Sequence, residues 1–285
     1  MTTAGTQTPE QPIKEVGFIG LGDQGLPMAR AIAEQGYTLH VWARRPSAIA
    51  LERTPHTVHA SIASLGAASD IVALCVGTDQ DVLQLVDGGL LGALRPGSLV
   101  INHGTGTPKN ARQMFDLCAS YGVVMVDAPV SGGRPAAEAR ALVVLAGGPD
   151  AAVATAAPVF ECFATVVAHV GGAGAGQLAK LFNNALLMMN QAAIADIMEL
   201  AGQAGFAPGP LVDALRAGSA DSRALSLMNT MVNPDTVGHL STVEALEMDL
   251  FQQAMTDAGV EATEATARGL SGARRLGDVI GWLNH

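Results

Sequence analysis

The sequence is short of basic charge, cysteine and long apolar runs, and each shortage excludes a class of protein. The 285 residues carry a formal net charge of -10, whereas a nucleic-acid partner would require a basic stripe. The three cysteines, Cys75, Cys118 and Cys162, make neither an even disulfide set nor a close metal-ligand spacing. We therefore expect reduced thiols, a cytoplasmic location, and neither a nucleic-acid partner nor a metal centre.

No apolar run is long enough to cross a membrane, so no membrane partner is expected. Residues 1–12 are polar and lack the basic start and apolar run of a signal peptide, which predicts a disordered tail. Aromatic residues make up only 4% of the chain, so Ala, Val, Leu and Met must fill the core. The hydrophobic content of 49% is nevertheless sufficient for two domains.

Lysine is also scarce, since the chain contains only Lys14, Lys109 and Lys180. Lys180 lies in an apolar, helix-prone segment, and Asn184 follows four residues later on the same helical face. An ammonium group in apolar surroundings has a lowered pKa and can exchange a proton near neutral pH. The segment is therefore a candidate general acid-base site. A surface lysine that extends to water is the alternative.

A glycine motif follows the first expected strand. Residues 16–36 read as a short buried strand, the turn Gly20-x-Gly22-x-x-Gly25 and a helix, and a second strand follows at residues 38–42. In such a turn the glycines permit a tight bend and the close approach of a pyrophosphate, and the helix N-terminus binds the anion. The pattern predicts a dinucleotide cofactor held by the residues of the turn, namely Gly20, Leu21, Gly22, Asp23, Gln24 and Gly25.

The second strand runs into Ala43-Arg44-Arg45, at the place where an NAD enzyme usually carries an acidic residue for the ribose hydroxyls. No carboxylate is present in this segment to repel a 2′-phosphate. Arg44 can stack on the adenine or bind that phosphate, and Arg45 offers a second donor. Ala43, Arg44 and Arg45 therefore favour NADP over NAD, unless both arginines are simply solvated.

Strand and helix patterns alternate as far as residue 170, which predicts an α/β fold with a Rossmann-type, doubly wound parallel sheet. Ligands of such sheets bind at the carboxyl ends of the strands. The loops expected there contain Val76 and Gly77, which we assign to the cofactor, then Thr105, and then Ser131-Gly132-Gly133. The exposed amides of the last loop can hold a carboxylate, although a plain turn has a similar composition.

The chain changes character after a glycine-rich connection at residues 171–176. Residues 177–205 read as one long helix that is apolar nearly all round, and further helices are expected at 210–217, 223–232, 242–258 and 261–284. We therefore predict a dinucleotide-binding domain at residues 13–170 and an all-α substrate and dimerisation domain at 171–285, built on a long interdomain helix. The apolar helix also predicts a homodimer or higher homo-oligomer.

Three blocks in this order resemble the β-hydroxyacid dehydrogenase family, which includes 3-hydroxyisobutyrate dehydrogenases, tartronate semialdehyde reductases and glyoxylate or succinic semialdehyde reductases. They are residues 17–29, Asp127-Ala-Pro-Val-Ser-Gly-Gly133, and Gly174-x-Gly176-x-x-x-Lys180-x-x-x-Asn184. The resemblance implies that Lys180 exchanges a proton with the substrate oxygen and that Asn184 helps to hold both groups. It also implies that Thr105 lies beside the nicotinamide and the substrate, and that the substrate carboxylate is bound by Ser131, Gly132 and Gly133.

Four positions depart from the family pattern. Gln24 stands where the glycine turn usually has methionine, and Gly104 replaces a Ser or Thr beside Thr105. Met248 stands where the family commonly has a second lysine near the cofactor, which leaves the substrate class open. Arg134 follows the Ser-Gly-Gly block where small residues are usual, and it is either a second anion contact or a solvated arginine.

These features predict an NADP-preferring oxidoreductase that interconverts a small 3-hydroxy acid, or a related hydroxy acid, and its semialdehyde or keto acid. Two alternatives remain open. Imine reductases share the architecture, but they generally carry Asp or Tyr at the position of Lys180 and lack the Ser-Gly-Gly loop. A dinucleotide-binding module without catalytic activity is consistent with Gly104 and Met248, whereas an intact Lys180, Asn184 and Ser131 argue against it.

Overall fold

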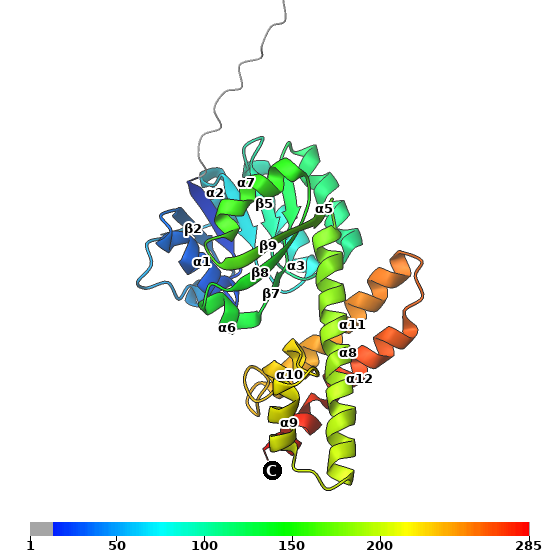
Figure 1. Cartoon of the computed structure of the whole chain (residues 1–285). Coiled ribbons are helices and arrows are strands. Elements are labelled where there is room, and N and C mark those ends of the chain that lie inside the picture. The colour runs from blue at the N-terminus through cyan, green and yellow to red at the C-terminus, as the bar shows by residue number, and fades with distance from the viewer. Residues whose placement is uncertain (1–13, 285) are drawn as a thin grey trace, which may run out of the picture.

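The computed structural model describes residues 14–284, so the tail expected at residues 1–12 lies outside the described residues. The N-terminal part forms a nine-stranded sheet flanked by helices, and the C-terminal part is helical (Figure 1). The strands are β1 (Glu15–Ile19), β2 (Thr38–Trp42), β3 (Thr57–Val58), β4 (Ile71–Leu74), β5 (Leu99–Asn102), β6 (Val124–Asp127), β7 (Val130–Ser131), β8 (Leu142–Gly147) and β9 (Ala164–Gly171).

The sheet has the order β3-β2-β1-β4-β5-β6-β8-β7, and β9 pairs with β8. The six strands from β3 to β6 in this order are parallel to their neighbours, which confirms the predicted Rossmann-type fold. The far end of the sheet differs from the prediction, because β8 is antiparallel to both β6 and β7. The link from β7 to β8 holds only a six-residue helix, and a parallel crossover usually needs a dozen residues or more.

Helices cover both faces of this sheet, so β4 and β5 are buried at every residue. Two apolar clusters fill the space, one around Phe18, Met28 and Phe160 and the other around Leu74, Leu90 and Val100. The helical segments of this part are α1 (Gly25–Glu34), η1 (Pro46–Ala48), α2 (Ile62–Ala68), α3 (Asp79–Leu85), η2 (Val86–Leu90), α4 (Leu91–Ala93), α5 (Pro108–Ser120), α6 (Gly133–Glu138) and α7 (Asp150–Phe160).

The C-terminal part is built around one long helix, α8, that leaves the sheet-containing part and runs the length of the helical part (Figure 1). Gly174 caps this helix with a φ of +84°, and the helix already begins at the next residue, so Gly176 belongs to the helix and not to a connection. Among residues 14–284, no helix combines the length and hydropathy that a membrane span needs. The helices are α8 (Ala175–Gln203), α9 (Pro208–Ala217), α10 (Arg223–Leu227), α11 (Val237–Asp257) and α12 (Thr263–Leu283).

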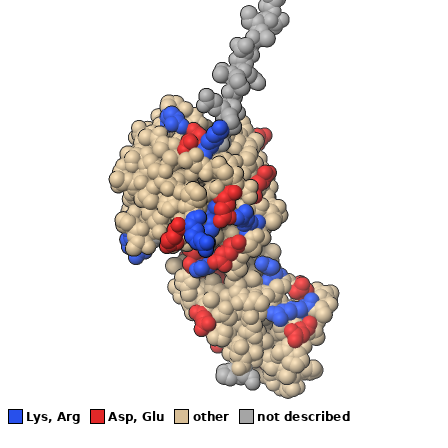
Figure 2. Space-filling model, turned by 90° about the vertical axis from the view of Figure 1, so that its left-hand side faces the viewer, with Lys and Arg blue, Asp and Glu red and all other residues tan. Residues whose placement is uncertain are grey.

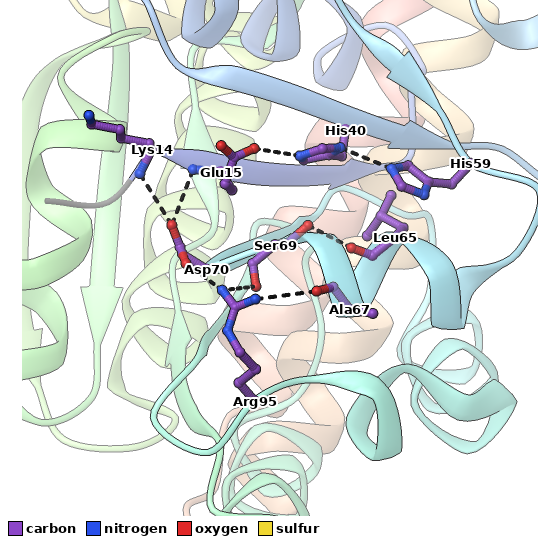
Figure 3. Close-up of polar contacts among 9 residues, drawn as sticks. All are labelled: Lys14, Glu15, His40, His59, Leu65, Ala67, Ser69, Asp70 and Arg95. Carbon is purple, nitrogen blue, oxygen red and sulfur yellow. Dashed lines mark hydrogen bonds and ion pairs between the residues drawn. The ribbon is translucent and has the colours of Figure 1, made fainter. Parts of the chain in front are cut away.

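Polar contacts tie the sheet together at the edge where β1 and β4 begin (Figure 3). One carboxylate oxygen of Asp70 accepts the backbone N–H groups of Lys14 and Glu15, each at 3.2 Å, and the other binds Arg95 at 2.6 Å. Lys14 therefore lies at the opposite edge from the carboxyl ends of the strands. On the face shown in Figure 2, acidic and basic side chains are intermixed, without a continuous basic stripe on that face.

Candidate active site

The glycine turn between β1 and α1 leaves no room for side chains at two of its three glycines. Gly20 has a φ of +100°, and a Cβ there would clash with the carbonyl oxygen of Cys75. A Cβ at Gly25 would clash with the carbonyl oxygen of Gly20, whereas a Cβ at Gly22 would meet nothing within 4 Å. A pyrophosphate can therefore approach the backbone at Gly22, and the turn fits the dinucleotide that the sequence predicts.

The N-terminus of α1 faces this open side. Its first turn contains no acidic residue, and its N-cap residue, Gln24, makes no side-chain capping bond, so no side chain of this turn competes with an anion for the helix N-terminus. Within the turn, Leu21 is buried and Asp23 is exposed, and Asp23 pairs with Arg134 at 3.5 Å. Arg134 is an exposed residue that also binds Glu138 at 2.8 Å, so the structure favours the surface arginine over the anion contact.

The end of β2, where the adenosine half of a dinucleotide would bind, carries the two predicted arginines. Arg45 is exposed, and Arg44 reaches across to α3, where its Nη2 lies 3.0 Å from Oδ1 of Asp81. A hydrogen bond from Thr78 and the Arg44 guanidinium hold the pKa of Asp81 below its usual range. A hollow of about 320 Å³ lies beside Ala43 and is lined by Trp42, Ala43, Pro46, Ile49, Val58, His59 and Ala60.

Lys180 lies in the second turn of α8, where the sequence predicts a helix. It is half-buried, and burial lowers the pKa of its ammonium group, while the charge of Glu247 on α11 acts in the opposite direction. Asn184, one turn further on, is 3% exposed. Its Oδ1 accepts a hydrogen bond from Asn183 at 3.0 Å, and its Nδ2 has no hydrogen-bond partner among the described residues. The pair thus offers an amine of lowered pKa and, one turn away, a buried amide.

The Ser-Gly-Gly block is more ordered than a loop. Ser131 belongs to β7, and Gly133 begins α6. Gly132 has a φ of +126° and Gly133 one of +66°, which side chains rarely tolerate, so glycine is required at both positions. Nδ2 of Asn183 lies 3.4 Å from Oγ of Ser131, so the block adjoins the turn of α8 that follows Lys180. The predicted carboxylate-binding block therefore lies beside the helix that carries the predicted proton-transfer residues.

The segment that carries Thr105, between β5 and α5, is fastened on both sides. Gln177 of α8 is 1% exposed, and its Oε1 accepts the N–H of Gly106 while its Nε2 donates to the carbonyl of Gly104, each at 2.8 Å. From the other side, Asp79 accepts the N–H of Thr107 at 3.0 Å. The segment is thereby held by Gln177, which lies one helical turn before Lys180 on α8. Nothing in the sequence singles out Gln177.

The same segment explains one departure from the family pattern. A Cβ at Gly104 would lie 2.7 Å from the carbonyl oxygen of Val76 and 3.2 Å from Oδ1 of Asn102. Glycine therefore allows the segments after β4 and β5 to pack against each other, and this contact joins Val76 and Gly77 to the Thr105 side of the site.

Asp127, at the carboxyl end of β6, fixes the start of α8. It is fully buried, and its two carboxylate oxygens accept the N–H groups of Gly174 at 2.9 Å and Gln177 at 2.8 Å. Burial raises the pKa of this carboxyl to about 6, although the backbone N–H groups of α8 favour its ionised form. Asp127 thereby fixes the start of α8 against the sheet, and so it also fixes the position of Lys180 in the second turn of that helix.

The helical part supplies a group that the sequence did not reveal. Met248, expected in the position of a second lysine, is fully buried in a core formed with Leu181 and Met188 of α8. The preceding residue, Glu247, faces the site instead: burial raises the pKa of its carboxyl, and Lys180 and the amide of Asn184 oppose that rise. Glu247 could be predicted from the sequence only if it were known which residues of α11 lie opposite which residues of α8.

Two family models match consecutive parts of the chain. One, described as the NAD binding domain of 6-phosphogluconate dehydrogenase, matches residues 15–171, and the other, described as NAD-binding of NADP-dependent 3-hydroxyisobutyrate dehydrogenase, matches residues 174–274. The chain belongs to the β-hydroxyacid dehydrogenase family. This confirms the resemblance read from the three sequence blocks.

Individual members of the β-hydroxyacid dehydrogenase family are similar over most of their length. A NAD-dependent L-serine dehydrogenase from Pseudomonas aeruginosa is 35% identical over 220 residues, which cover 76% of this chain and 74% of that protein. A 3-hydroxyisobutyrate dehydrogenase from the same organism is 32% identical over 218 residues, which cover 75% and 73%. The solved structure of Mycobacterium tuberculosis 3-hydroxyisobutyrate dehydrogenase with L-serine is 27% identical and matches with a TM-score of 0.83, covering 96% of this chain and 100% of that one.

Proposed function

We propose that this β-hydroxyacid dehydrogenase prefers NADP and uses Lys180 as its general acid-base group. That the chain is an NAD(P)-dependent oxidoreductase of small hydroxy acids follows from its family. The observation that carries the assignment of Lys180 is its place: a half-buried amine of lowered pKa, between the Ser-Gly-Gly block and the Thr105 segment.

The substrate we propose is a small 3-hydroxy acid. L-serine and 3-hydroxyisobutyrate, the compounds in the names of two relatives, both carry a primary hydroxyl two bonds from the carbon that bears the carboxylate. The amides and hydroxyl of Ser131, Gly132 and Gly133 would bind the carboxylate. Lys180 and Asn184 would then hold the hydroxyl, and Thr105 would border the reacting carbon.

The nicotinamide cofactor supplies hydride transfer when it is bound. In the direction of oxidation, Lys180 accepts the hydroxyl proton as the C–H bond gives up its hydride and the C=O bond forms; in reduction it returns that proton. Asn184 orients the substrate oxygen towards the amine. For the cofactor itself, we propose contacts from residues 20–25, 43–45, 76, 77 and 105.

NADP is favoured by the two arginines that follow β2 and by the lack of an acidic residue in that segment. We also propose that residues 13–170 form the dinucleotide-binding domain, that residues 171–285 form a substrate and dimerisation domain, and that the protein acts as a homo-oligomer in the cytoplasm. The exposed apolar residues on α8 support the oligomer, and the three free cysteine thiols suit a reducing compartment.

The replacement Lys180→Ala tests the assignment. Loss of a general acid-base group is expected to lower kcat by at least ~10²-fold while NADPH affinity stays near that of the wild type. Steady-state turnover of L-serine and 3-hydroxyisobutyrate, together with calorimetric titration of NADPH, measures both quantities. Lys14→Ala, at the opposite edge of the sheet, is the control and should behave as the wild type. An unchanged kcat in Lys180→Ala would remove the assignment, and reduction of a cyclic imine without activity on any hydroxy acid would favour an imine reductase.

A further inference from the structure

An acidic stretch of α11 faces the candidate site from the helical part. The helices α8 and α11 are antiparallel, because Gln191 Nε2 donates to Glu244 Oε1 at 3.0 Å near the middle of α8, and the rings of Phe182 and Phe251 lie 6.0 Å apart nearer its start. Glu247 comes between Glu244 and Phe251 on α11, so it lies opposite the part of α8 that follows Phe182.

Glu247 is therefore next to both predicted proton-transfer residues. It is half-buried, its charge acts on Lys180, and the Lys180 ammonium and the Asn184 amide act on it. Glu244, one turn away along α11, is 5% exposed. Burial raises the pKa of the Glu244 carboxyl, and the charge of the neighbouring Glu247 raises it further. Two acidic side chains thus lie where a hydroxy acid, which is itself an anion, would bind.

Two buried acceptor atoms beside these carboxyls have no hydrogen-bond partner within residues 14–284. They are Oε2 of Glu244 and Oε1 of Gln191, on side chains that are 5% and 1% exposed. A buried polar atom left without a partner destabilises the fold, so such atoms are rare in native structures. Both atoms are acceptors, and Glu247 adds further acceptor capacity, so the group that best completes this stretch is a cation with several N–H donors.

The charges around Lys180 lead to the same chemistry. With Met248 in the core, no second lysine from this part of α11 balances the substrate carboxylate, and Glu247 offsets the charge of Lys180. A substrate with only a carboxylate would be repelled by Glu247, whereas a zwitterion would place its ammonium against that side chain.

We propose that Glu247, with Glu244 and Gln191 behind it, is a subsite for the protonated amine of the substrate, and that the site therefore takes 3-hydroxy amino acids in preference to plain 3-hydroxy acids. The inference rests on the proposed function and deepens it. Three elements then contact three different substituents of one carbon chain: the Ser131 block contacts the carboxylate, Lys180 the hydroxyl and Glu247 the ammonium. Such a three-point arrangement also selects one enantiomer at the carbon that carries the amine.

Two compounds of matched size test the subsite, because L-serine carries an ammonium where (S)-3-hydroxyisobutyrate carries a methyl group. The wild type is expected to turn over L-serine with at least ~10-fold higher kcat/KM, and Glu247→Gln is expected to lower that ratio at least ~10-fold, mainly by raising the KM for L-serine. The ratio cancels any effect of the replacement on Lys180 that both compounds share. Glu264→Gln, an exposed carboxylate in the first turn of α12, is the control and should keep the wild-type ratio.

Calorimetric titration of both compounds into the complex with NADPH separates this inference from the proposed function. If NADPH binds and neither compound is turned over, the proposed function is wrong, and the ratio of the two dissociation constants still decides the subsite. Equal or weaker binding of L-serine by the wild type, or an unchanged ratio in folded Glu247→Gln, would overturn the inference. Thermal unfolding shows whether the variant is folded, and if it is not, the wild-type ratio decides alone.

Discussion

Arg44 has two competing uses. Its guanidinium pairs with Asp81 at 3.0 Å, and it is also the side chain that we propose for the 2′-phosphate of NADP. Loss of a charge-assisted contact predicts that Arg44→Ala weakens NADPH binding about 10- to 100-fold and leaves NADH binding within a few-fold of the wild type. Calorimetric titration of both cofactors measures the change, with the exposed Arg274→Ala on α12 as control. Equal losses for both cofactors would show that Arg44 does not read the phosphate.

His103 makes stability depend on pH. It is buried between Phe160 and Phe163, whose ring centroids lie 5.7 and 5.5 Å away, and Nδ1 donates to the Ala128 carbonyl at 2.8 Å. Burial lowers the pKa of the imidazole to about 4. In the unfolded chain this imidazole binds a proton near pH 6.5, whereas in the folded chain it does so only near pH 4. The contribution of His103 to the free energy of unfolding is therefore present above pH 6.5 and falls by about 2 kcal/mol between pH 7 and 5.

Urea unfolding of the wild type and His103→Gln at pH 7 and pH 5 measures this loss. The comparison with a variant is needed because burial raises the pKa of Asp127 to about 6 and of Glu244 to about 7, which changes stability with the opposite sign over the same range. The glutamine keeps a donor for the Ala128 carbonyl and does not titrate, so the variant should lose less stability at pH 5 than the wild type. Identical pH dependence would show that His103 remains protonatable in the folded state.

Single residues could be predicted where the chemistry is local to the chain. Lys180 and Asn184 share one turn of one helix, and Gly20 and Gly25 sit in one turn, so the sequence places them correctly on their elements. Glu247 and Gln177 could not be predicted, because their roles depend on contacts between distant parts of the chain. Glu247 acts on Lys180, 67 positions away, and Gln177 binds Gly106, 71 positions away. Such contacts appear only once the helices have packed.

The start of α8 is the element on which the site depends, because it connects the Thr105 segment with Lys180. In Gln177→Leu, the N–H of Gly106 and the carbonyl of Gly104 lose their buried partners. We expect a loss of about 2 kcal/mol or more in the free energy of unfolding, and a fall in kcat that exceeds any change in NADPH affinity. Chemical unfolding and steady-state kinetics measure both effects, and Gln203→Leu, at the exposed end of the same helix, is the matched control. Normal kcat in a folded Gln177→Leu would show that Thr105 needs no such support.

Elements with a full hydrophobic period were predicted well and short ones were not. β2 begins and ends where the sequence indicates, and α8 differs by two residues at each end. β7, with two residues, and α6, with six, were read as a loop because neither is long enough to show a period. The helix expected to start at residue 242 begins at Val237, and the one expected to reach residue 232 ends at Leu227.

At the scale of the whole molecule, α8 has an apolar face that the other elements of the same chain leave exposed. Phe182, Leu186, Ile197 and Leu200 are 50%, 60%, 48% and 59% exposed. Their spacings of 4, 11 and 3 residues keep them on one face of the helix, while the other faces pack against α10, α11 and α12. An apolar face of this length on the central helix is typical of a subunit interface.

We therefore predict that the protein is a dimer and that Leu186→Glu converts it to a monomer, because a carboxylate at the centre of the contact would have to be buried without a partner. Sedimentation-velocity centrifugation at micromolar concentration measures the mass of each species. Tyr121→Ser, which removes a 51% exposed aromatic residue from the end of α5 in the other half of the molecule, should remain a dimer. A monomeric wild type would contradict the prediction, and the exposed face of α8 would then require a different partner. A dimeric Leu186→Glu would place the interface on another surface.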